Sequence, residues 1–120
     1  MPPAAIAELL AELEELSGKY GVVIPCFGHA GDGNLHARII KGQETPVERW
    51  EALKPEILAG LYRTVRRLGG TISGEHGIGM KRSPYLPLVM GPALIELQRR
   101  VKLAFDPLNI LNPGKIFPSP

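Results

Sequence analysis

The sequence contains a single cysteine, which excludes one common way of stabilising a small protein. Cys26 has no second cysteine in the 120-residue chain with which to form an internal disulfide. Because structural disulfides persist in oxidising compartments and are rare in reducing ones, we expect this protein to act in the cytoplasm. No signal peptide is visible at the N-terminus, which agrees with this expectation.

Long apolar runs and a strong charge imbalance are also missing. No apolar stretch approaches the ~20 residues that a transmembrane helix needs. The net charge is only +2 and no extended basic run is present, so nothing indicates binding to nucleic acid. Hydrophobic residues make up 44% of the chain and charged residues 22%, as in globular domains. At this length we expect one domain over residues 1–120.

The chain does have two glycine-rich segments, and they contain all three of its histidines. Residues 28–36 (GHAGDGNLH) include His29 and His36, and residues 74–79 (GEHGIG) include the third histidine beside Glu75. Glycine lets the backbone approach a ligand closely or adopt a positive φ angle without a steric clash. We therefore interpret the two segments as halves of one site.

Two imidazoles and a carboxylate form a donor set that suits zinc, manganese or iron(II), with a coordination position left for water or substrate. His29 and His36 flank an Asp-Gly turn, so we predict a hairpin in which their imidazoles face each other across the strands. Glu75 is the predicted third ligand, which leaves His76 for proton transfer. Taken singly, each histidine also fits a structural or solvated residue near a turn.

The N-terminal third of the chain predicts a helix followed by a strand. Apolar residues recur at helical spacing between residues 6 and 16, and Gly18 is the predicted stop. We expect this helix to pack on the protein's own sheet. Residues 21–27 form an apolar run typical of a strand, with an edge or a bulge at Pro25 because proline lacks the N–H that a ladder needs.

Residues 34–40 alternate between apolar and polar side chains, which predicts a second strand with one buried face. His36 and Arg38 share the polar face, so we interpret that face as the functional one. A guanidinium beside His36 suits a bidentate pair with a substrate carboxylate. A solvated surface arginine explains the pattern equally well.

The middle of the chain predicts a long helix. Residues 45–48 (TPVE) match a capping box with proline at the first helical position, and a helical apolar stripe extends to Leu68. Pro55 interrupts the stripe, which predicts a kink or two abutting helices. Residues 71–73 are predicted to form a short strand that leads into Glu75.

The C-terminal third predicts helices that start near Ser83 and Gly91, the second ending at Asp106. Lys81, just after the second glycine-rich segment, is positioned to present a cation to an anionic substrate. Residues 112–115 (NPGK) have the composition of a turn. The last helix is predicted to bury a stripe of Leu94, Leu97, Val101 and Ala104.

This order of elements is α+β, and it predicts a ferredoxin-like antiparallel sheet that lacks its first strand, followed by C-terminal helices. A missing strand leaves an unpaired sheet edge, which tends to pair with another chain. We therefore expect a homo-oligomer.

Three motifs together resemble the FAD-linked oxidase C-terminal domain. They are GHAGDGNLH at 28–36, GGTISGEHGIG at 69–79 and DPxxILNPGK at 106–115. This domain belongs to the group that includes the glycolate oxidase D subunit, D-lactate dehydrogenase and D-2-hydroxyglutarate dehydrogenase. The resemblance implies an FAD-dependent oxidoreductase acting on a small 2-hydroxy acid. It also implies the roles of four residues: His29, His36 and Glu75 as metal ligands and His76 as the active-site base.

The resemblance has two further implications. The C-terminal motif runs back towards the flavin in this family, which makes Asn112 a predicted cofactor contact. An FAD-binding domain does not fit into 120 residues, so we expect another domain or subunit to supply it. The alternative is a non-catalytic metal-binding or interaction module, and flavin bound to the purified protein would separate the two possibilities.

Overall fold

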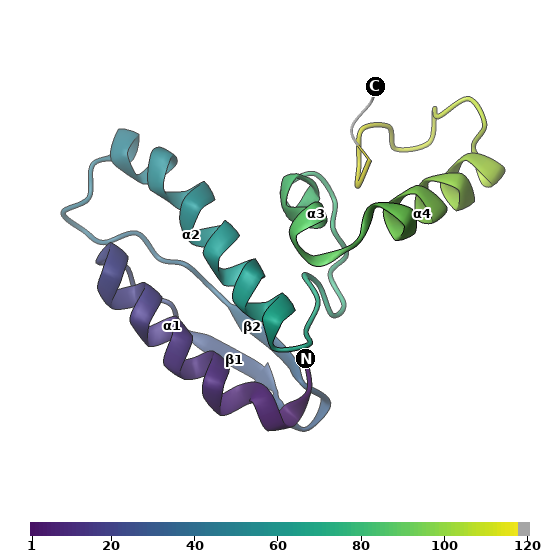
Figure 1. Cartoon of the computed structure of the whole chain (residues 1–120). Coiled ribbons are helices and arrows are strands. Elements are labelled where there is room, and N and C mark those ends of the chain that lie inside the picture. Colours follow the sequence, from purple (N-terminus) through teal and green to yellow (C-terminus); the bar gives the residue numbers. More distant parts are fainter. Residues whose placement is uncertain (118–120) are drawn as a thin grey trace.

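Two long helices and a β-hairpin make up the first part of the structure, which a computed structural model describes for residues 1–117 (Figure 1). Helices α1 (Ile6–Tyr20) and α2 (Val47–Arg67) lie side by side, and strands β1 (Cys26–His29) and β2 (Asn34–Ala37) pair antiparallel. This confirms the α+β class. The described residues contain two strands, so the ferredoxin-like order stays a prediction.

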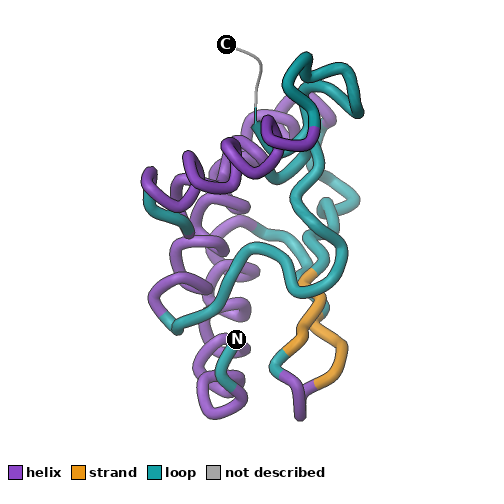
Figure 2. The backbone as a smooth tube through the Cα atoms, turned by 90° about the vertical axis from the view of Figure 1, so that its right-hand side faces the viewer, coloured by secondary structure: helices purple, strands orange, loops and turns teal. Residues whose placement is uncertain are grey.

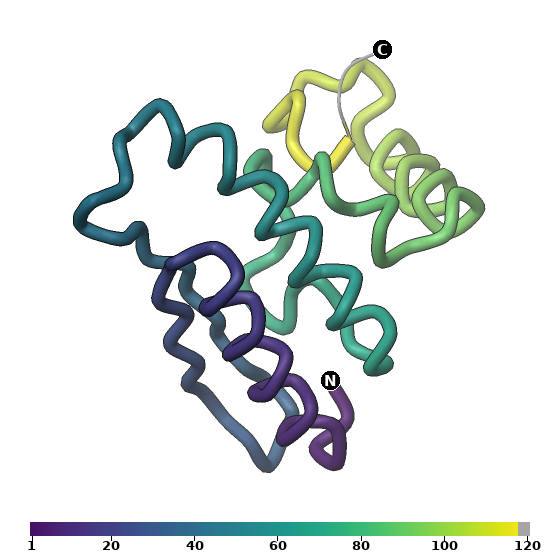
Figure 3. Tube along the Cα trace, turned by 60° about the vertical axis from the view of Figure 1, so that its left-hand side comes forward, coloured from purple at the N-terminus to yellow at the C-terminus, as the bar shows by residue number. Residues whose placement is uncertain are grey.

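The remaining elements are short, apart from the last helix. None of the helices in residues 1–117 combines the length and apolar character needed to cross a membrane. Figures 1 and 3 show the last helix and the tail after it set apart from α1 and the hairpin, with the short third helix in between. These elements are η1 (Pro3–Ala5), η2 (Ala30–Asp32), η3 (Ser83–Tyr85), α3 (Leu86–Val89) and α4 (Pro92–Phe105).

The main core lies where α1 and α2 pack against one face of the hairpin, as Figure 2 shows from the side. Ile57 of α2 is fully buried at its centre, and burying such a side chain contributes about 1.5–3 kcal/mol. The apolar residues of the second strand segment pack on this core, so their polar neighbours face outward. The buried core residues are Leu9, Leu13, Val22, Ile24, Ile57 and Leu61.

A second, smaller cluster anchors the segment after α2. Ile72 is buried together with Leu86 and Val89 of α3, and Tyr62 of α2 packs against them. Residues 71–73 do not form the predicted strand. Burial of Ile72 still holds this segment in place, so the second glycine-rich loop starts from a fixed point beside α2.

Two helix boundaries differ from the sequence predictions. Gly18 lies inside α1, and the helix ends instead at Gly21, which has φ 62° and donates its N–H to the Ser17 carbonyl. At the start of α2 the N-cap is Pro46, and no side chain makes a capping hydrogen bond, so the predicted capping box does not form. Pro55 lies within a single helix, α2, rather than between two.

The strands are shorter than predicted because Pro25 interrupts the ladder. Pro25 has no N–H, but its carbonyl accepts a hydrogen bond from the Arg38 N–H at 3.0 Å. Beyond it, Val23 and Ile40 form an isolated bridge. The regular strands therefore cover only the four residues on each side of the turn, as drawn in orange in Figure 2.

The predicted buried stripe of α4 is wrong. Leu94, Leu97 and Val101 are 47%, 56% and 53% exposed, and α4 has no buried residue. Helical spacing correctly predicted an amphipathic helix. It could not show that α4 would extend away from the main core (Figure 1).

Asp106, the C-cap of α4, organises the tail that follows. It is buried, and its carboxylate accepts hydrogen bonds from the backbone N–H groups of Ile110 and Leu111, both at 3.0 Å. Lys102 contacts the same carboxylate and donates to the Leu111 carbonyl at 2.9 Å. The bond from Lys102 and the two backbone bonds hold the pKa of Asp106 below its usual value.

The Asp106 network predicts a pH-dependent tail. A carboxyl group with a lowered pKa stabilises the folded state above its unfolded pKa, and this contribution is lost as the pH falls through the folded pKa. We expect the amide protons of Ile110 and Leu111 to be protected from exchange at neutral pH and to lose protection in acid below about pH 4. Hydrogen exchange followed by NMR measures this.

Asp106→Asn should remove the acid-dependent step and lower protection already at neutral pH. Asp32→Asn, at an exposed carboxylate in the hairpin turn, is the matched control and should leave the tail unchanged. Equal protection in Asp106→Asn and wild-type protein would show that the carboxylate does not hold the tail.

Candidate metal and substrate site

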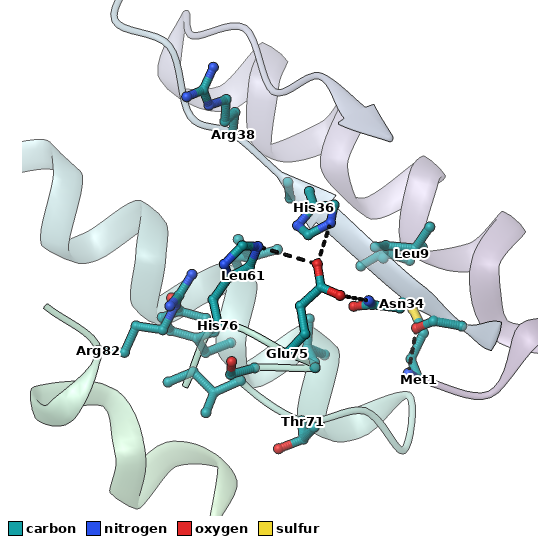
Figure 4. Close-up of a pocket in the computed structure, with 18 of the residues that line it drawn as sticks. Met1, Leu9, Asn34, His36, Arg38, Leu61, Thr71, Glu75, His76 and Arg82 are labelled. Atoms are coloured by element: carbon teal, nitrogen blue, oxygen red, sulfur yellow. Dashed lines mark hydrogen bonds and ion pairs between the residues drawn. The ribbon is translucent and has the colours of Figure 1, made fainter. Parts of the chain in front are cut away.

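Two predicted site residues, His36 and His76, converge on one carboxylate oxygen of a third, Glu75. The Nε2 atoms of His36 and His76 each lie 3.3 Å from Oε1 of Glu75. The three ligand atoms all lie within 4.8 Å of one another, and theirs is the one such group found in residues 1–117. Figure 4 shows the carboxylate between the two imidazoles. The two glycine-rich segments are therefore halves of one cluster.

The hairpin register places His36. It lies opposite Phe27, and the two rings are 5.4 Å apart. Leu35 and Ala37, its neighbours in β2, pack on the main core. Because side chains alternate along a strand, burial of these neighbours turns the imidazole of His36 towards the outer face.

The second half of the cluster is held by contacts around its loop. Asn34 of β2 donates from Nδ2 to Oε2 of Glu75 at 3.1 Å. Arg82 donates from Nη1 to the Gly77 carbonyl at 2.9 Å, which ties the loop to the segment before η3. Gly77 and Gly79 have φ angles of 70° and 58°, in the left-handed region that glycine adopts without strain.

A cavity of about 740 Å³ lies beside the cluster, and its lining carries two guanidinium groups, Arg38 and Arg82 (Figure 4). Tyr62 of α2 also lines it, and burial raises the pKa of this phenol while Arg82 acts in the opposite direction. The phenol thus remains a hydrogen-bond donor at neutral pH. With Glu75 as the only carboxylate in its described lining, the cavity favours an anion.

His29 does not join the cluster. It lies opposite Asn34 in the ladder, so the expectation that His29 and His36 face each other is wrong. The turn between the strands consists of residues 30–33, so His36 is the third residue of β2 and not the first. His29 still shares the outer face with His36, because residues 27 and 29 pair with residues 36 and 34.

The other two predicted contacts lie outside the cavity lining. Lys81 is exposed, whereas the next residue, Arg82, lines the cavity. Asn112 is exposed in the tail, with φ 48°. Their predicted roles in substrate and cofactor binding stay predictions.

Sequence reasoning missed three residues at the site: Asn34, Tyr62 and Arg82. Strand alternation was a usable signal for Asn34, because it lies two positions before His36 and hence on the same face. No local pattern pointed to Tyr62, which reaches the cavity only because α2 passes beside the second glycine-rich loop.

Curated relatives match nearly the whole chain. Glycolate oxidase subunit GlcD of Bacillus subtilis is 40% identical over 98% of this chain, and the D-lactate dehydrogenase of Archaeoglobus fulgidus is 44% identical over 97%. The D-2-hydroxyglutarate dehydrogenase of Stutzerimonas stutzeri is 38% identical over 93%. The matched part makes up 24%, 25% and 25% of these three relatives, so the chain spans about a quarter of their length.

The match to a family model is equally extensive. Residues 1–116 match the model described as FAD linked oxidases, C-terminal domain, and these residues include both glycine-rich segments and the tail. The matched part contains all the helices and strands described above, the cluster of His36, Glu75 and His76, and the residues that line the cavity. The chain therefore belongs to the family of FAD-linked oxidase C-terminal domains.

Proposed function

We propose that this chain is the C-terminal part of a flavin-dependent oxidoreductase that acts on a small 2-hydroxy acid of the glycolate or D-lactate type. The observation that carries this proposal is the convergence of two imidazoles on the Glu75 carboxylate beside a cavity with two guanidinium groups. Family membership and the activities for which the relatives are named support the reaction type. A chain that folds but takes no part in catalysis is the alternative.

The donor atoms fit a divalent metal ion. In a tetrahedral zinc site with bonds of about 2.0–2.1 Å, neighbouring donor atoms lie about 3.3–3.4 Å apart. In the cluster of His36, Glu75 and His76, both imidazole Nε2 atoms lie 3.3 Å from Oε1 of Glu75, and all three donor atoms lie within 4.8 Å of one another. Zinc, manganese or iron(II) would suit two nitrogen donors and one carboxylate oxygen.

The proposed ligands are His29, His36 and Glu75, with His76 as the base. His29 is the last residue of β1 and lies on the same face as His36, next to a turn that contains Gly31 and Gly33. The position of His76 in the cluster supports a competing ligand set, in which it replaces His29. The two sets assign opposite roles to the two histidines, so substitution separates them.

His76 is suited to accept a proton from the substrate hydroxyl. Its side chain is 62% exposed and lines the cavity, and Oε1 of Glu75 lies 3.3 Å from its Nε2. A bound metal would supply a Lewis acid that polarises the hydroxyl oxygen, and FAD would supply the acceptor for the α-hydrogen as hydride. His76 thus removes the hydroxyl proton. Loss of this proton together with the α-hydride converts the 2-hydroxy acid to a 2-oxo acid.

The substrate carboxylate would bind to the cations of the cavity. We propose Arg38 and Arg82 for this role, with Lys81 as a further predicted contact. Arg82 uses one donor on the Gly77 carbonyl, and a guanidinium has five N–H donors in all. The remaining donors suit a carboxylate, which pairs with guanidinium in a bidentate arrangement.

The flavin would come from the part of the enzyme that this chain does not include. We propose an FAD-binding domain or subunit as partner, with Asn112 contributing from the tail. The chain spans about a quarter of its relatives, and exposed apolar side chains gather on α4 and the tail. They are Leu94, Leu97, Val101, Leu103, Phe105, Leu108, Ile110 and Leu111.

We also propose that the chain self-associates through the hairpin and acts in the cytoplasm. Each strand has a single strand neighbour among the described residues, which leaves two unpaired edges. Val23, Phe27 and Ile40 of the hairpin region are 58%, 54% and 48% exposed. An isologous dimer would pair a strand edge of each chain and cover these apolar side chains.

The first prediction separates the two ligand sets. Titration of the metal-free chain with Mn²⁺ or Zn²⁺ in a calorimeter should show that His29→Ala, His36→Ala and Glu75→Ala each weaken binding by more than about 100-fold, because loss of a ligand costs more than loss of an outer-shell partner. His76→Ala should bind nearly normally. Glu14→Ala, at an exposed glutamate of α1, is the control.

Loss of binding in His76→Ala but not in His29→Ala would assign the metal to His36, Glu75 and His76 and remove His76 from the role of base. A wild-type chain that binds neither ion would contradict the metal site altogether.

The second prediction tests the cavity cations. D-lactate titrated into the chain should shift NMR signals of cavity residues, and Arg38→Gln or Arg82→Gln should weaken this binding roughly 10- to 100-fold, the effect of a charge-assisted hydrogen bond. Lys81→Gln tests the third predicted contact in the same way. Arg63→Gln, at an exposed position of α2, should change nothing. Unchanged affinity in both cavity variants would contradict the proposed carboxylate subsite.

The third prediction concerns assembly. Light scattering at micromolar concentration should give a mass of about twice the 13.0 kDa of one chain, because a two-fold dimer pairs an open edge. Ile40→Lys should return the mass to that of a monomer. Val47→Lys is the matched control, since Val47 is 61% exposed but lies outside the hairpin. A wild-type mass near 13.0 kDa at every concentration would rule out the dimer.

A further inference from the structure

Asn34 contacts the Glu75 carboxylate, although it directly follows the turn residues Gly31-Asp32-Gly33 in the sequence. It is the first residue of β2 and shares the outer face with His36. Its Nδ2 donates to Oε2 of Glu75 at 3.1 Å, across 41 positions in the sequence. The other oxygen of that carboxylate, Oε1, is the atom that meets both histidines. Each oxygen of Glu75 thus has its own partners (Figure 4).

This division of partners determines how the carboxylate is oriented. The terminal torsion of a glutamate is broad and intrinsically allows many orientations. Glu75 is also half-exposed, so packing alone does not restrict it. A donor from Asn34 on Oε2 selects the rotation in which Oε1 points at His36 and His76.

Gly74 provides independent evidence that this contact is built into the site. A Cβ added at Gly74 would overlap Oδ1 of Asn34 and lie 3.0 Å from its Cγ. Any larger residue at position 74 would push the amide out of its place beside Glu75. The Gly74 backbone is not in the left-handed region, so the approach of the Asn34 side chain is what a larger residue at this position would disturb.

We propose that Asn34 is a positioning residue, whose hydrogen bond orients the Glu75 carboxylate so that Oε1 faces His36 and His76. Glycine at position 74 leaves the space that the Asn34 side chain occupies. This inference rests on the proposed metal site and adds an outer-shell partner to it. Outer-shell partners orient metal ligands, and their loss typically costs 10- to 100-fold in metal affinity.

The test compares two ways of removing the same contact. Asn34→Leu keeps the approximate size of the side chain but removes the donor, and Gly74→Ala keeps Asn34 but displaces its amide. Both should weaken Mn²⁺ binding to the chain by about 10- to 100-fold in calorimetry. Gln43→Leu makes the same chemical change at an exposed position before α2 and should bind as wild type does. Wild-type affinity in Asn34→Leu and Gly74→Ala would overturn the proposal.

A second measurement distinguishes positioning from a general effect on folding and needs no metal. The side-chain NH₂ signals of Asn34 in the metal-free chain should shift in Glu75→Ala and in Gly74→Ala and should be unaffected by Gln43→Leu. Signals that stay in place in Glu75→Ala would show that the contact does not exist and would overturn the inference. If the wild-type chain binds no metal, the proposed metal site fails, and these signals still decide whether Asn34 holds Glu75.

Discussion

Burial of one face of the hairpin is the constraint on which the rest of the structure depends. Leu35, Ala37 and Ile39 pack on the core formed by α1 and α2. Because the side-chain period of a strand is two, their burial turns His36 and Asn34 to the other face. A register slip of one residue would bury the imidazole and expose the apolar side chains. The face on which the site residues of β2 lie thus follows from the burial of its apolar residues in the core.

The second half of the site depends on a different anchor. α2 runs back along the hairpin, so that its C-terminal end comes near the turn between the strands (Figure 1). Ile72 then fixes the chain against α2 and α3, just before the second glycine-rich loop. Glu75 and His76 can stay exposed and still be held in place, because Ile72, Asn34 and Arg82 fix the loop from three sides.

Exposed apolar side chains are concentrated on α4 and the tail that follows it. Within residues 1–117 the buried apolar side chains belong to the main core and the smaller cluster around Ile72, and most apolar side chains of α4 and the tail are exposed. Asp106 orders the start of that tail through hydrogen bonds from backbone N–H groups, and Ile116 further along packs against the Ile72 cluster. A tail ordered in this way presents an apolar surface of the kind that marks interaction sites, as the proposed contact with an FAD-binding domain requires.

The sequence by itself determined the α+β class, the donor types and the outer face of the hairpin, because helix and strand periodicity are local properties. Only the tertiary structure decided that His76 rather than His29 meets His36 and Glu75, and that Arg82 rather than Lys81 lines the cavity. These outcomes depend on the length of one turn and on the approach of segments about 40 residues apart. Local periodicity assigns a side chain to a face, but distances between faces follow from how the helices pack.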